Sequence, residues 1–469
     1  MIDYKLIRDK IIHIENHYPV DKWEINGIQI WPFIRIKLCL FLWYDNPSSP
    51  IKNTTRTGKK NNFFNKLTSR IRSKTGIIKR TIWLKKLPIK DNLFIGHNSH
   101  RVDYKNKKFN RFFDLQIENQ SLNHNSILFE CGSSPIIKLY NNKIIKSYQS
   151  SLENYLYNKY NSKKTNPTNS SLDFFNDFLE YLHINETESL VKKFSLEKLN
   201  EVTKILSIKT DFFILVLEKI KPKKIYILCY YTDDNMCLIN AANLLGIQTI
   251  EVQHGPQTDT NMCYSHWTKI PALGFNPIPK TFWCWDDASS SVILKWAQKS
   301  NIYSSLVVGN FWVDYWKGKN YNYFEKKFIL YTLQIGLTLD ELFPLELINI
   351  IKNNDIKWFM RLHPRQSEEK EKIISLFRKF NIMDKIDIEN ATKEFLPILL
   401  SNCLLHVTHH SGSALEASYF NKKTIILNKI GEHYFDHLIE KNQAYFIEYS
   451  NPDLQKKFNE ILNQIVNQT

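Results

Sequence analysis

Short apolar runs that alternate with helical patterns constrain the fold of this chain more than any other feature of its sequence. Two separate strand patterns, 92–98 and 126–132, come first, and a long helical pattern follows over 196–220. Strand and helix patterns then alternate at 223–231, 234–246, 247–255, 280–286, 288–299 and 305–310. A strand, a helix and a second strand in succession form a βαβ unit, whose two strands are parallel neighbours.

A second series begins after a break near residues 311–326. Strands and helices alternate again at 327–333, 340–353, 356–364, 367–380, 404–410, 412–420 and 423–428. A chain of 469 residues exceeds the length at which one hydrophobic core usually stops growing. The sequence therefore predicts an α/β protein with two doubly wound domains that face each other across a cleft, with ligands at the carboxyl ends of the strands.

Changes of composition set the expected domain boundaries. The segment near 141–171 is rich in Asn, Ser, Lys and Tyr, which predicts loops or an insertion in the first α/β domain. We expect an N-terminal helical segment (1–50), a basic segment (51–90), a first α/β domain (91–315), a second α/β domain (316–455) and a C-terminal helix (456–469).

Cysteine usage and hydropathy indicate the compartment. Seven cysteines lie scattered without a CxxC pair, which indicates reduced thiols and neither a disulfide framework nor a thiolate zinc site. No apolar run reaches the roughly 18–20 residues that span a bilayer. The first residues mix charged and apolar side chains, unlike a secretory signal. We therefore expect a cytoplasmic protein.

The charge is concentrated in the basic segment. Residues 51–90 hold 13 Lys or Arg and no Asp or Glu, in a chain whose net charge is +16. Interleaved Phe, Ile, Trp and Leu residues fit an anionic membrane surface, and nucleic acid or a solvated linker are the alternatives. We expect docking on the anionic inner-membrane surface, which makes the protein peripheral there, and no nucleic-acid partner.

Two motifs in the second series are typical of phosphate binding. In "RLHPR", Arg361 and Arg365 can neutralise charge, His363 can donate to a phosphate, and Pro364 fixes the turn. In "THHSGSALEA", the residues from Thr408 through Ser411, Gly412 and Ser413 lie where a strand turns into a helix, so that backbone N–H groups and hydroxyls face an anion.

Glu416 lies three residues after Ser413 and has two interpretations. Its carboxylate can close a capping box at the helix start, or it can bind a ribose hydroxyl pair. Gly309 and Asn310 follow another predicted strand, and we include them among the donor-binding residues.

The turn "QHG" after the 247–255 strand carries the candidate base. His254 has a ring pKa near neutrality and can act as a general base, with Gln253 and Gly255 beside it in an active-site loop. Asp233 and Asp234 are adjacent, which suits a helix N-cap better than a metal pair. The histidines at 406, 409, 410, 433 and 437 match no zinc spacing, and we predict no metal site.

These motifs in this order resemble the GT-B glycosyltransferases of bacterial surface polysaccharide assembly, the enzymes of lipopolysaccharide O-antigen and capsule synthesis. The resemblance is carried by "INGIQIWPFIRIKL" (25–38), "EVQHG" with "IPKTFWCWDD", "VVGN" (307–310), and "RLHPR" with "THHSGSALEASYFNKKTIIL". It implies the GT-B fold, with two Rossmann-like domains. The first domain would bind the acceptor, and the second would bind the nucleotide-sugar donor without a bound metal or cofactor.

The resemblance also implies roles for single residues. His363 and Pro364 are similar to the HP motif of transferases that use CMP-activated Kdo or sialic acid, whose histidine contacts the donor phosphate. Ser411 and Ser413 resemble the accompanying serine pair. Several of those families have an acidic base where this chain has Gln253-His254-Gly255, so His254 is the first choice for the catalytic base, with Asp259 and Asp233 behind it.

We therefore predict a glycosyltransferase that moves a sugar from a nucleotide-activated donor to a lipid-linked or oligosaccharide acceptor. Three alternatives share the fold. They are a polyol-phosphate transferase that uses CDP-glycerol, a nucleotide-sugar 2-epimerase, and a polysaccharide-assembly scaffold without turnover.

Overall fold

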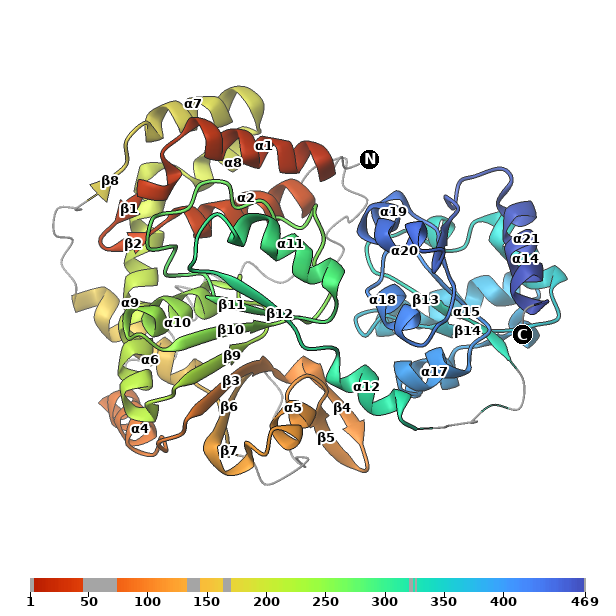
Figure 1. The fold of residues 1–469 in the computed structure, drawn as a ribbon, viewed down its shortest axis with the longest axis horizontal. Helices are drawn as coiled ribbons and strands as arrows, with labels where there is room; N and C mark the ends of the chain where they lie inside the picture. The colour runs from red at the N-terminus through yellow and green to blue at the C-terminus, as the bar shows by residue number, and fades with distance from the viewer. Residues whose placement is uncertain are drawn as a thin grey trace. The chain divides into compact units, whose positions relative to one another are not determined.

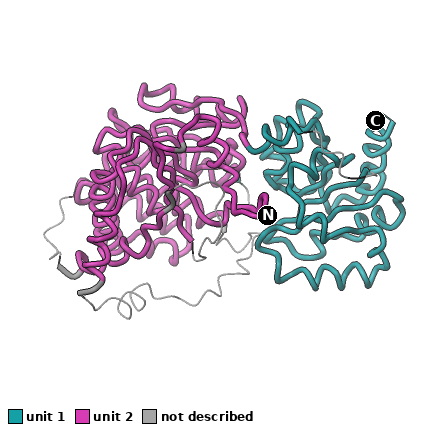
Figure 2. Tube along the Cα trace, turned by 90° about the horizontal axis from the view of Figure 1, so that it is seen from below, with its two compact units in different colours: residues 1–4, 44–54, 312–469 teal, residues 5–43, 55–311 magenta. Residues whose placement is uncertain are grey.

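The chain forms two compact units, which Figure 2 separates by colour. A computed structural model describes residues 4–44, 74–132, 144–162, 170–319, 324 and 327–467. The N-terminal unit takes its described residues from 5–43 and 55–311, and the C-terminal unit takes its own from 312–469 together with Tyr4 and Tyr44. No helix among the described residues is long and apolar enough to cross a bilayer.

A parallel seven-stranded sheet is the centre of the N-terminal unit. In space the strands follow the order β12-β11-β10-β9-β3-β6-β7 (Figure 1). Along the chain they are β3 (Asn92–His97), β6 (Ser126–Cys131), β7 (Ile144–Lys146), β9 (Lys224–Ile227), β10 (Gln248–Val252), β11 (Thr281–Cys284) and β12 (Ser304–Val307). β6 and β7 lie on one side of β3 and β9 to β12 lie on the other, so the direction of winding reverses between β3 and β9. This is the topological switch point of a doubly wound sheet.

The C-terminal unit repeats this plan with a parallel six-stranded sheet, in the order β15-β14-β13-β16-β17-β18. Along the chain the strands are β13 (Phe328–Thr332), β14 (Lys357–Arg361), β15 (Ile386–Asp387), β16 (Leu405–Thr408), β17 (Thr424–Ile426) and β18 (Ala444–Phe446). The switch point lies between β13 and β16. The expected α/β class with two doubly wound domains is confirmed, and the cleft between them stays a prediction.

Helices connect the strands of both sheets. In the N-terminal half they are α1 (Tyr4–His17), α2 (Trp31–Tyr44), α4 (Lys74–Lys85), α5 (Asp114–Asn119), α6 (Gln149–Ser162), α7 (Phe175–Asn185), α8 (Glu188–Lys193), α9 (Leu196–Ile220), α10 (Asp233–Leu244) and α11 (Asp287–Ala297). In the C-terminal half they are α12 (Phe311–Lys317), α13 (Leu339–Leu342), α14 (Leu345–Asn353), α15 (Lys370–Lys379), α16 (Glu389–Lys393), α17 (Leu396–Asn402), α18 (Ser413–Tyr419), α19 (Lys429–Tyr434), α20 (Asp436–Glu440) and α21 (Leu454–Val466). Two small antiparallel sheets, β2 (Ile28–Gln29)-β1 (Glu24–Ile25)-β8 (Ser170–Ser171) and β4 (Arg101–Tyr104)-β5 (Lys107–Asn110), complete the N-terminal unit.

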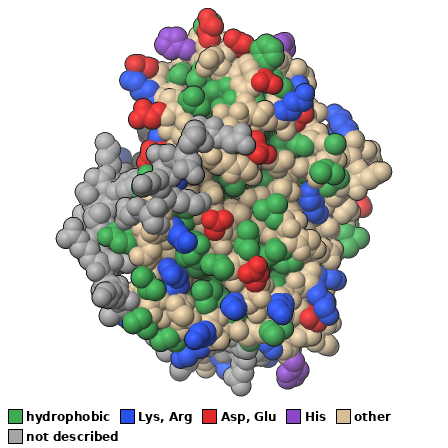
Figure 3. Space-filling view, turned by 90° about the vertical axis from the view of Figure 1, so that its left-hand side faces the viewer, with side chains coloured by type: hydrophobic (Ala, Val, Ile, Leu, Met, Phe, Trp, Pro, Cys, Tyr) green, Lys and Arg blue, Asp and Glu red, His purple; other side chains and the backbone are tan. Residues whose placement is uncertain are grey.

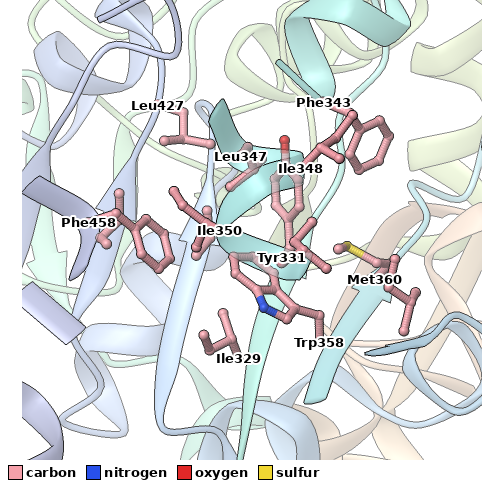
Figure 4. Packing of buried hydrophobic residues seen from close by; sticks show 14 of the residues in the cluster. Ile329, Tyr331, Phe343, Leu347, Ile348, Ile350, Trp358, Met360, Leu427 and Phe458 are labelled. Atoms are coloured by element: carbon pink, nitrogen blue, oxygen red, sulfur yellow. The ribbon is translucent and has the colours of Figure 1, made fainter. Parts of the chain in front are cut away.

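Side chains of the C-terminal sheet alternate between two buried layers, as the pleat of a strand requires. Ile329, Tyr331, Trp358 and Met360 point to one face, where they pack with α14 and α21 (Figure 4). Their neighbours Phe328, Leu330 and Phe359 point to the other face, against α17 and α18. Because both faces are covered, the central strands β13 and β14 contain unbroken apolar runs, which is why the sequence pattern located them.

Two expectations about local structure need correction. Residues 141–171 do not form loops throughout, because Gln149–Ser162 form α6, whose Leu152, Tyr155 and Leu156 are buried. The helix expected over 340–353 is two helices, α13 and α14, since Pro344 precedes α14 at its N-cap and cannot continue the ladder of α13. Of the basic segment, residues 74–85 form α4, and residues 51–73 lie outside the described residues.

A buried ion pair joins α1 and α2 to the long loop after β10. Arg35 Nε donates to Glu15 Oε1 at 2.7 Å, and both side chains are fully buried. The Arg35 Nη atoms donate to the carbonyls of Met262, Ser265 and His266. Glu15 Oε2 accepts from the backbone N–H and the hydroxyl of Thr268, at 2.8 and 2.6 Å. The two helices therefore hold residues 262–268 through a fully bonded pair of charges.

Replacing Arg35 by Met should destabilise the N-terminal unit by about 3–5 kcal/mol, because Glu15 would remain as a buried charge without its partner. Urea unfolding followed by tryptophan fluorescence measures the change. The matched control is Lys192→Met, which removes the exposed Lys192–Glu188 pair of α8, whose side chains are 73% and 71% accessible. The control should change the free energy of unfolding far less than Arg35→Met does, because solvent screens an exposed pair. Equal effects of the two substitutions would contradict the role given to Arg35.

Candidate functional site

Polar side chains of both units collect at the carboxyl ends of the strands that flank each switch point. In the C-terminal unit they follow β13, β14 and β16, and in the N-terminal unit they follow β3, β9 and β10. These edges are where doubly wound sheets bind ligands.

Gln334 connects the two predicted phosphate-binding motifs of the C-terminal unit. Gln366, at the end of the "RLHPR" turn, donates through Nε2 to the carbonyl of Gln334 at 2.9 Å. The backbone N–H of His410, in "THHSGS", donates to Gln334 Oε1 at 3.1 Å. Residues from β13, β14 and β16 are thereby held at one edge. Gln334 was not predicted, because a glutamine after an apolar strand carries no signal of its own.

His363 is half-buried and has one ring nitrogen already bonded. Its Nδ1 accepts from the backbone N–H of Arg365 at 3.1 Å. Burial, helped by the charge of Arg365, lowers the pKa of His363 to about 4. At neutral pH the ring is therefore uncharged, and its single proton is on Nε2. His363 is thus a neutral N–H donor.

The remaining residues of "RLHPR" differ in exposure and bonding. Arg361 Nη1 donates to the carbonyls of Ala391 and Glu394, both at 2.6 Å, and so fastens α16 to β14. Arg365 and Pro364 are exposed at the turn. The predicted phosphate contact of Arg361 would thus have to be made by a guanidinium that already binds two backbone carbonyls.

A hydroxyl and imidazole cluster crosses the switch point itself. Thr332 Oγ1 lies 2.8 Å from Ser413 Oγ and 3.0 Å from His406 Nε2. Thr408 Oγ1 donates to the carbonyl of Thr332 at 3.1 Å, and His406 Nδ1 lies 3.0 Å from Thr424 Oγ1. The hydroxyls of Thr408 and Ser413 therefore bond within the unit. Thr332 and Thr424 were not predicted, because a threonine inside a strand pattern is common and does not indicate a site.

The start of α18 brings Ser411 and Gly412 to the same edge. Ser411 Oγ accepts from the backbone N–H of Ser413 at 3.3 Å. Gly412 is the N-cap of α18, and no side chain caps the helix there. The helix thus begins one residue earlier than the capping box predicted with Ser413 as its N-cap, and the two interpretations of the half-buried Glu416 both stay predictions.

Gly309 and Asn310 belong to the N-terminal unit, whereas the other residues predicted to bind the donor belong to the C-terminal unit. They follow β12, the edge strand of the N-terminal sheet, and Gly309 has a φ of 79° that favours glycine. The donor role predicted for this pair stays a prediction.

His254 lies at the edge of the N-terminal sheet among three side chains that can exchange protons with it. Its Nε2 is 3.0 Å from Cys229 Sγ and 3.3 Å from the hydroxyl of Tyr231. Its Nδ1 is 3.7 Å from Glu251 Oε1. Cys229 and Tyr231 follow β9, and Glu251 belongs to β10, so neighbouring strands assemble the group.

The pKa shifts of this group have a common cause in burial. Burial lowers the pKa of His254 to about 4, with a smaller contribution from Arg111. It raises the pKa of Cys229 to about 12, so the thiol stays protonated. Burial also raises the pKa of Glu251, against the hydrogen bonds from Tyr264 and the Tyr230 N–H. The side chain of His254 keeps 18% of its surface accessible and is neutral at pH 7.

Cys229 occupies a strained position in the turn from β9 to α10. Its φ is 54°, in the left-handed region that non-glycine residues rarely adopt. Such strain persists only where the surrounding structure imposes it, and it is common at functional sites. The conformation aims Sγ at His254. Neither Cys229 nor Glu251 was predicted, since Glu251 lies within an apolar strand pattern and Cys229 within another.

Gln253 fixes the turn that carries His254. It is fully buried, accepts from the backbone N–H of Trp285 at 2.6 Å, and donates to the carbonyl of Gly255 at 2.9 Å. A methyl group added at Gly255 would meet no atom within 4 Å, so this residue borders open space beside His254.

The two aspartates considered as alternative bases are bound in ion pairs. Asp259 lies 2.9 Å from His266 Nε2, 3.1 Å from Arg8 Nη1 and 3.6 Å from Lys295 Nζ. The hydrogen bond from His266, together with the charges of Lys295 and Arg8, holds its pKa well below the usual range. Asp233 pairs with Lys37 at 3.3 Å, and Thr232 is the N-cap of α10. A carboxylate held ionised by Arg8, Lys295 and the hydrogen bond from His266 is a weak base, which favours His254 over Asp259.

Two further histidines extend this edge toward β3. His97 ends β3, and its ring centroid lies 6.1 Å from that of His100. Burial, together with the charges of His254, Arg111 and His97, lowers the pKa of His100 to about 3. His100 Nδ1 is buried and has no hydrogen-bond partner within the described chain. No three His, Cys, Asp or Glu side chains of the described residues are placed to hold a metal ion.

We found no match to the sequence among protein-family models or curated proteins. The UDP-GlcNAc 2-epimerase of Methanocaldococcus jannaschii, solved with UDP-GlcNAc and UDP, is 17% identical, with a TM-score of 0.47 over 79% of this chain and 92% of that one. Anabaena Alr3699/HepE in complex with UDP is 9% identical, with a TM-score of 0.41 over 80% and 90%. The glycosyltransferase VinC in complex with dTDP is 11% identical, with a TM-score of 0.38 over 80% and 91%. No residue of this chain is assigned from these similarities.

The buried histidines predict that the C-terminal unit loses stability in mild acid. Burial lowers the pKa of His406 and His409 to about 3 and that of His410 to about 4. In the unfolded chain these rings bind protons near pH 6.5. The unfolded state thus binds more protons below that pH, and stability present above it is lost as the pH falls toward 4.

Urea unfolding at several pH values between about 7.5 and 5.5 measures this loss. His406→Gln should reduce the pH dependence by about 1 kcal/mol per pH unit, because one buried site no longer titrates. The exposed His124→Gln is the control and should leave the dependence unchanged. A free energy of unfolding that stays constant over this range would contradict the prediction.

Proposed function

We propose that the protein transfers a glycosyl group from a nucleotide-activated donor to a hydroxyl of a lipid-linked or oligosaccharide acceptor, in the synthesis of a bacterial surface polysaccharide such as O-antigen or capsule. The observation that carries the proposal is the collection of proton-handling and N–H-donating side chains at the switch points of two doubly wound sheets. Such edges bind nucleotides and present catalytic residues to them.

The donor is assigned to the C-terminal unit. His363 offers a neutral Nε2–H, and the loop at Ser411 and Gly412 offers backbone N–H groups where α18 begins. Donors of this kind bind phosphate oxygens and stabilise the negative charge that develops on a departing nucleotide. Glu416, on the first turn of α18, is assigned to the ribose. In this proposal the charge is carried by these groups, and no cofactor is required.

The base is assigned to His254 in the N-terminal unit. We place its ring proton on Nδ1, because the protonated thiol of Cys229 and the hydroxyl of Tyr231 lie beside Nε2 and can donate to it. Nε2 is then the accepting atom. An acceptor hydroxyl would take the place of these two neighbours, transfer its proton to Nε2 and attack the anomeric carbon as the nucleotide departs.

A panel of nucleotide sugars, with and without a mixture of oligosaccharide acceptors, tests the reaction. A transferase should release free nucleotide only when an acceptor is present. An epimeric nucleotide sugar formed without acceptor would assign the 2-epimerase reaction, and turnover of CDP-glycerol alone would assign the polyol-phosphate reaction. Nucleotide binding with no turnover of any substrate would indicate a scaffold. Each of these three outcomes contradicts the proposal.

Substitutions of Cys229 and His254 test which of these two neighbours is the catalytic base and whether the other is a nucleophile. His254→Ala should lower kcat by about 10²–10⁴-fold with nucleotide affinity unchanged, since general-base catalysis supplies that much. Cys229→Ala should keep turnover within about tenfold of the wild type, because its thiol is protonated and serves only as a neighbour of Nε2. Steady-state kinetics and calorimetry measure both quantities. A folded His254→Ala variant with normal turnover would show that another residue is the base.

A further inference from the structure

α4 belongs to the folded body of the N-terminal unit and is fixed to it by one face. Trp83 packs on Phe129 of β6 and stacks on Phe212 of α9, with ring centroids 6.0 and 6.2 Å apart. Arg80 donates to Asn154 of α6 at 3.1 Å and lies over the ring of Tyr155. The orientation of α4 on the unit is therefore set by these contacts.

Three isoleucines of α4 are exposed. Ile77, Ile78 and Ile82 keep 43%, 57% and 46% of their surface accessible. At 100° per residue, Ile78 and Ile82 lie one above the other on the face opposite Arg80 and Trp83, and Ile77 lies at the flank of that face, nearer to Arg80. Ile89, which follows the helix, is 68% accessible. Single exposed apolar residues are ordinary in soluble proteins, but a group of large ones on one helix face marks an interaction surface.

Lysines share this face with the isoleucines. Lys79 lies between Ile78 and Ile82 in the sequence and is exposed, as are Lys85 and Lys86 at the end of the helix. Residues 74–90 contain no Asp or Glu. On the side of the molecule that carries α4, α6 and α9, exposed hydrophobic side chains lie between Lys and Arg side chains over the lower half (Figure 3).

We propose that the outer face of α4 docks on an anionic lipid surface, with Ile77, Ile78 and Ile82 in the acyl boundary and the lysines on the headgroups. An apolar stripe flanked by cations is the pattern of a helix that lies in a membrane interface. Nucleic acid would use the same cations, but it binds through phosphates and stacked bases, for which isoleucine has no counterpart. The surface goes beyond the proposed reaction and does not depend on it.

Co-sedimentation of the full chain with vesicles tests the surface. The wild type should sediment with phosphatidylcholine vesicles that contain about 30% phosphatidylserine, remain in solution with phosphatidylcholine alone, and be released as salt screens the lysines. The double variant Ile78→Asn/Ile82→Asn should lower the partition coefficient by about tenfold or more. The matched control is Ile184→Asn on α7, at a position that is 74% accessible, which should bind like the wild type.

The outcomes are decisive in both directions. A wild type that stays in solution with anionic vesicles, or a double variant that binds them as the wild type does, overturns the proposal. Binding to an RNA duplex in place of vesicles, retained by the double variant, also overturns it. The wild type, the double variant and the Ile184→Asn control should turn over a water-soluble acceptor at equal rates. A wild type without this turnover would contradict the proposed reaction and would not test the α4 surface.

Discussion

The buried pair of Glu15 and Arg35 is the constraint on which the architecture of the N-terminal unit depends. Removing two charges from water costs several kcal/mol per ion, and only complete hydrogen bonding offsets it. Arg35 meets this requirement with three carbonyls of the loop after β10, and Glu15 with Thr268 and Trp31. The pair therefore specifies one position of a loop that is irregular over more than twenty residues between β10 and β11.

A chain of contacts leads from this pair to His254. The loop segment held by Arg35 contains Tyr264, whose hydroxyl donates to Glu251 Oε1 at 2.8 Å. Glu251 in turn lies 3.7 Å from His254 Nδ1. A change at Arg35 thus reaches the predicted base through three contacts. In the "WPFIR" stretch, Trp31 and Arg35 both donate to Glu15, which is the physical reason for these two residues. The stretch lies far from His254 in the sequence.

The sequence predicted the parts of the fold that are set by continuous burial. Strands such as β13 and β14, apolar on both faces, were located to within a few residues, and the predicted ends of β10 and β14 located His254 and His363. The edge strands β15 and β18 have two and three residues, too few for a pattern. The sequence also did not show which side chains form hydrogen bonds or ion pairs with the site residues. Whether an aspartate such as Asp259 is a base or an ion-pair member depends on cations up to 251 residues away in the chain.

The two histidines at the switch points are proposed for opposite functions, and the neighbours of their ring nitrogens agree with that difference. Burial keeps both rings neutral, so each carries a single proton. In His363 a backbone N–H occupies Nδ1, which forces the proton to Nε2 and makes the ring a donor. In His254 the protonated thiol of Cys229 and the hydroxyl of Tyr231 lie within hydrogen-bonding distance of Nε2 and can donate to it, as the proposed role of Nε2 as an acceptor requires. No side-chain substitution at Arg365 short of proline would remove the N–H that orients His363.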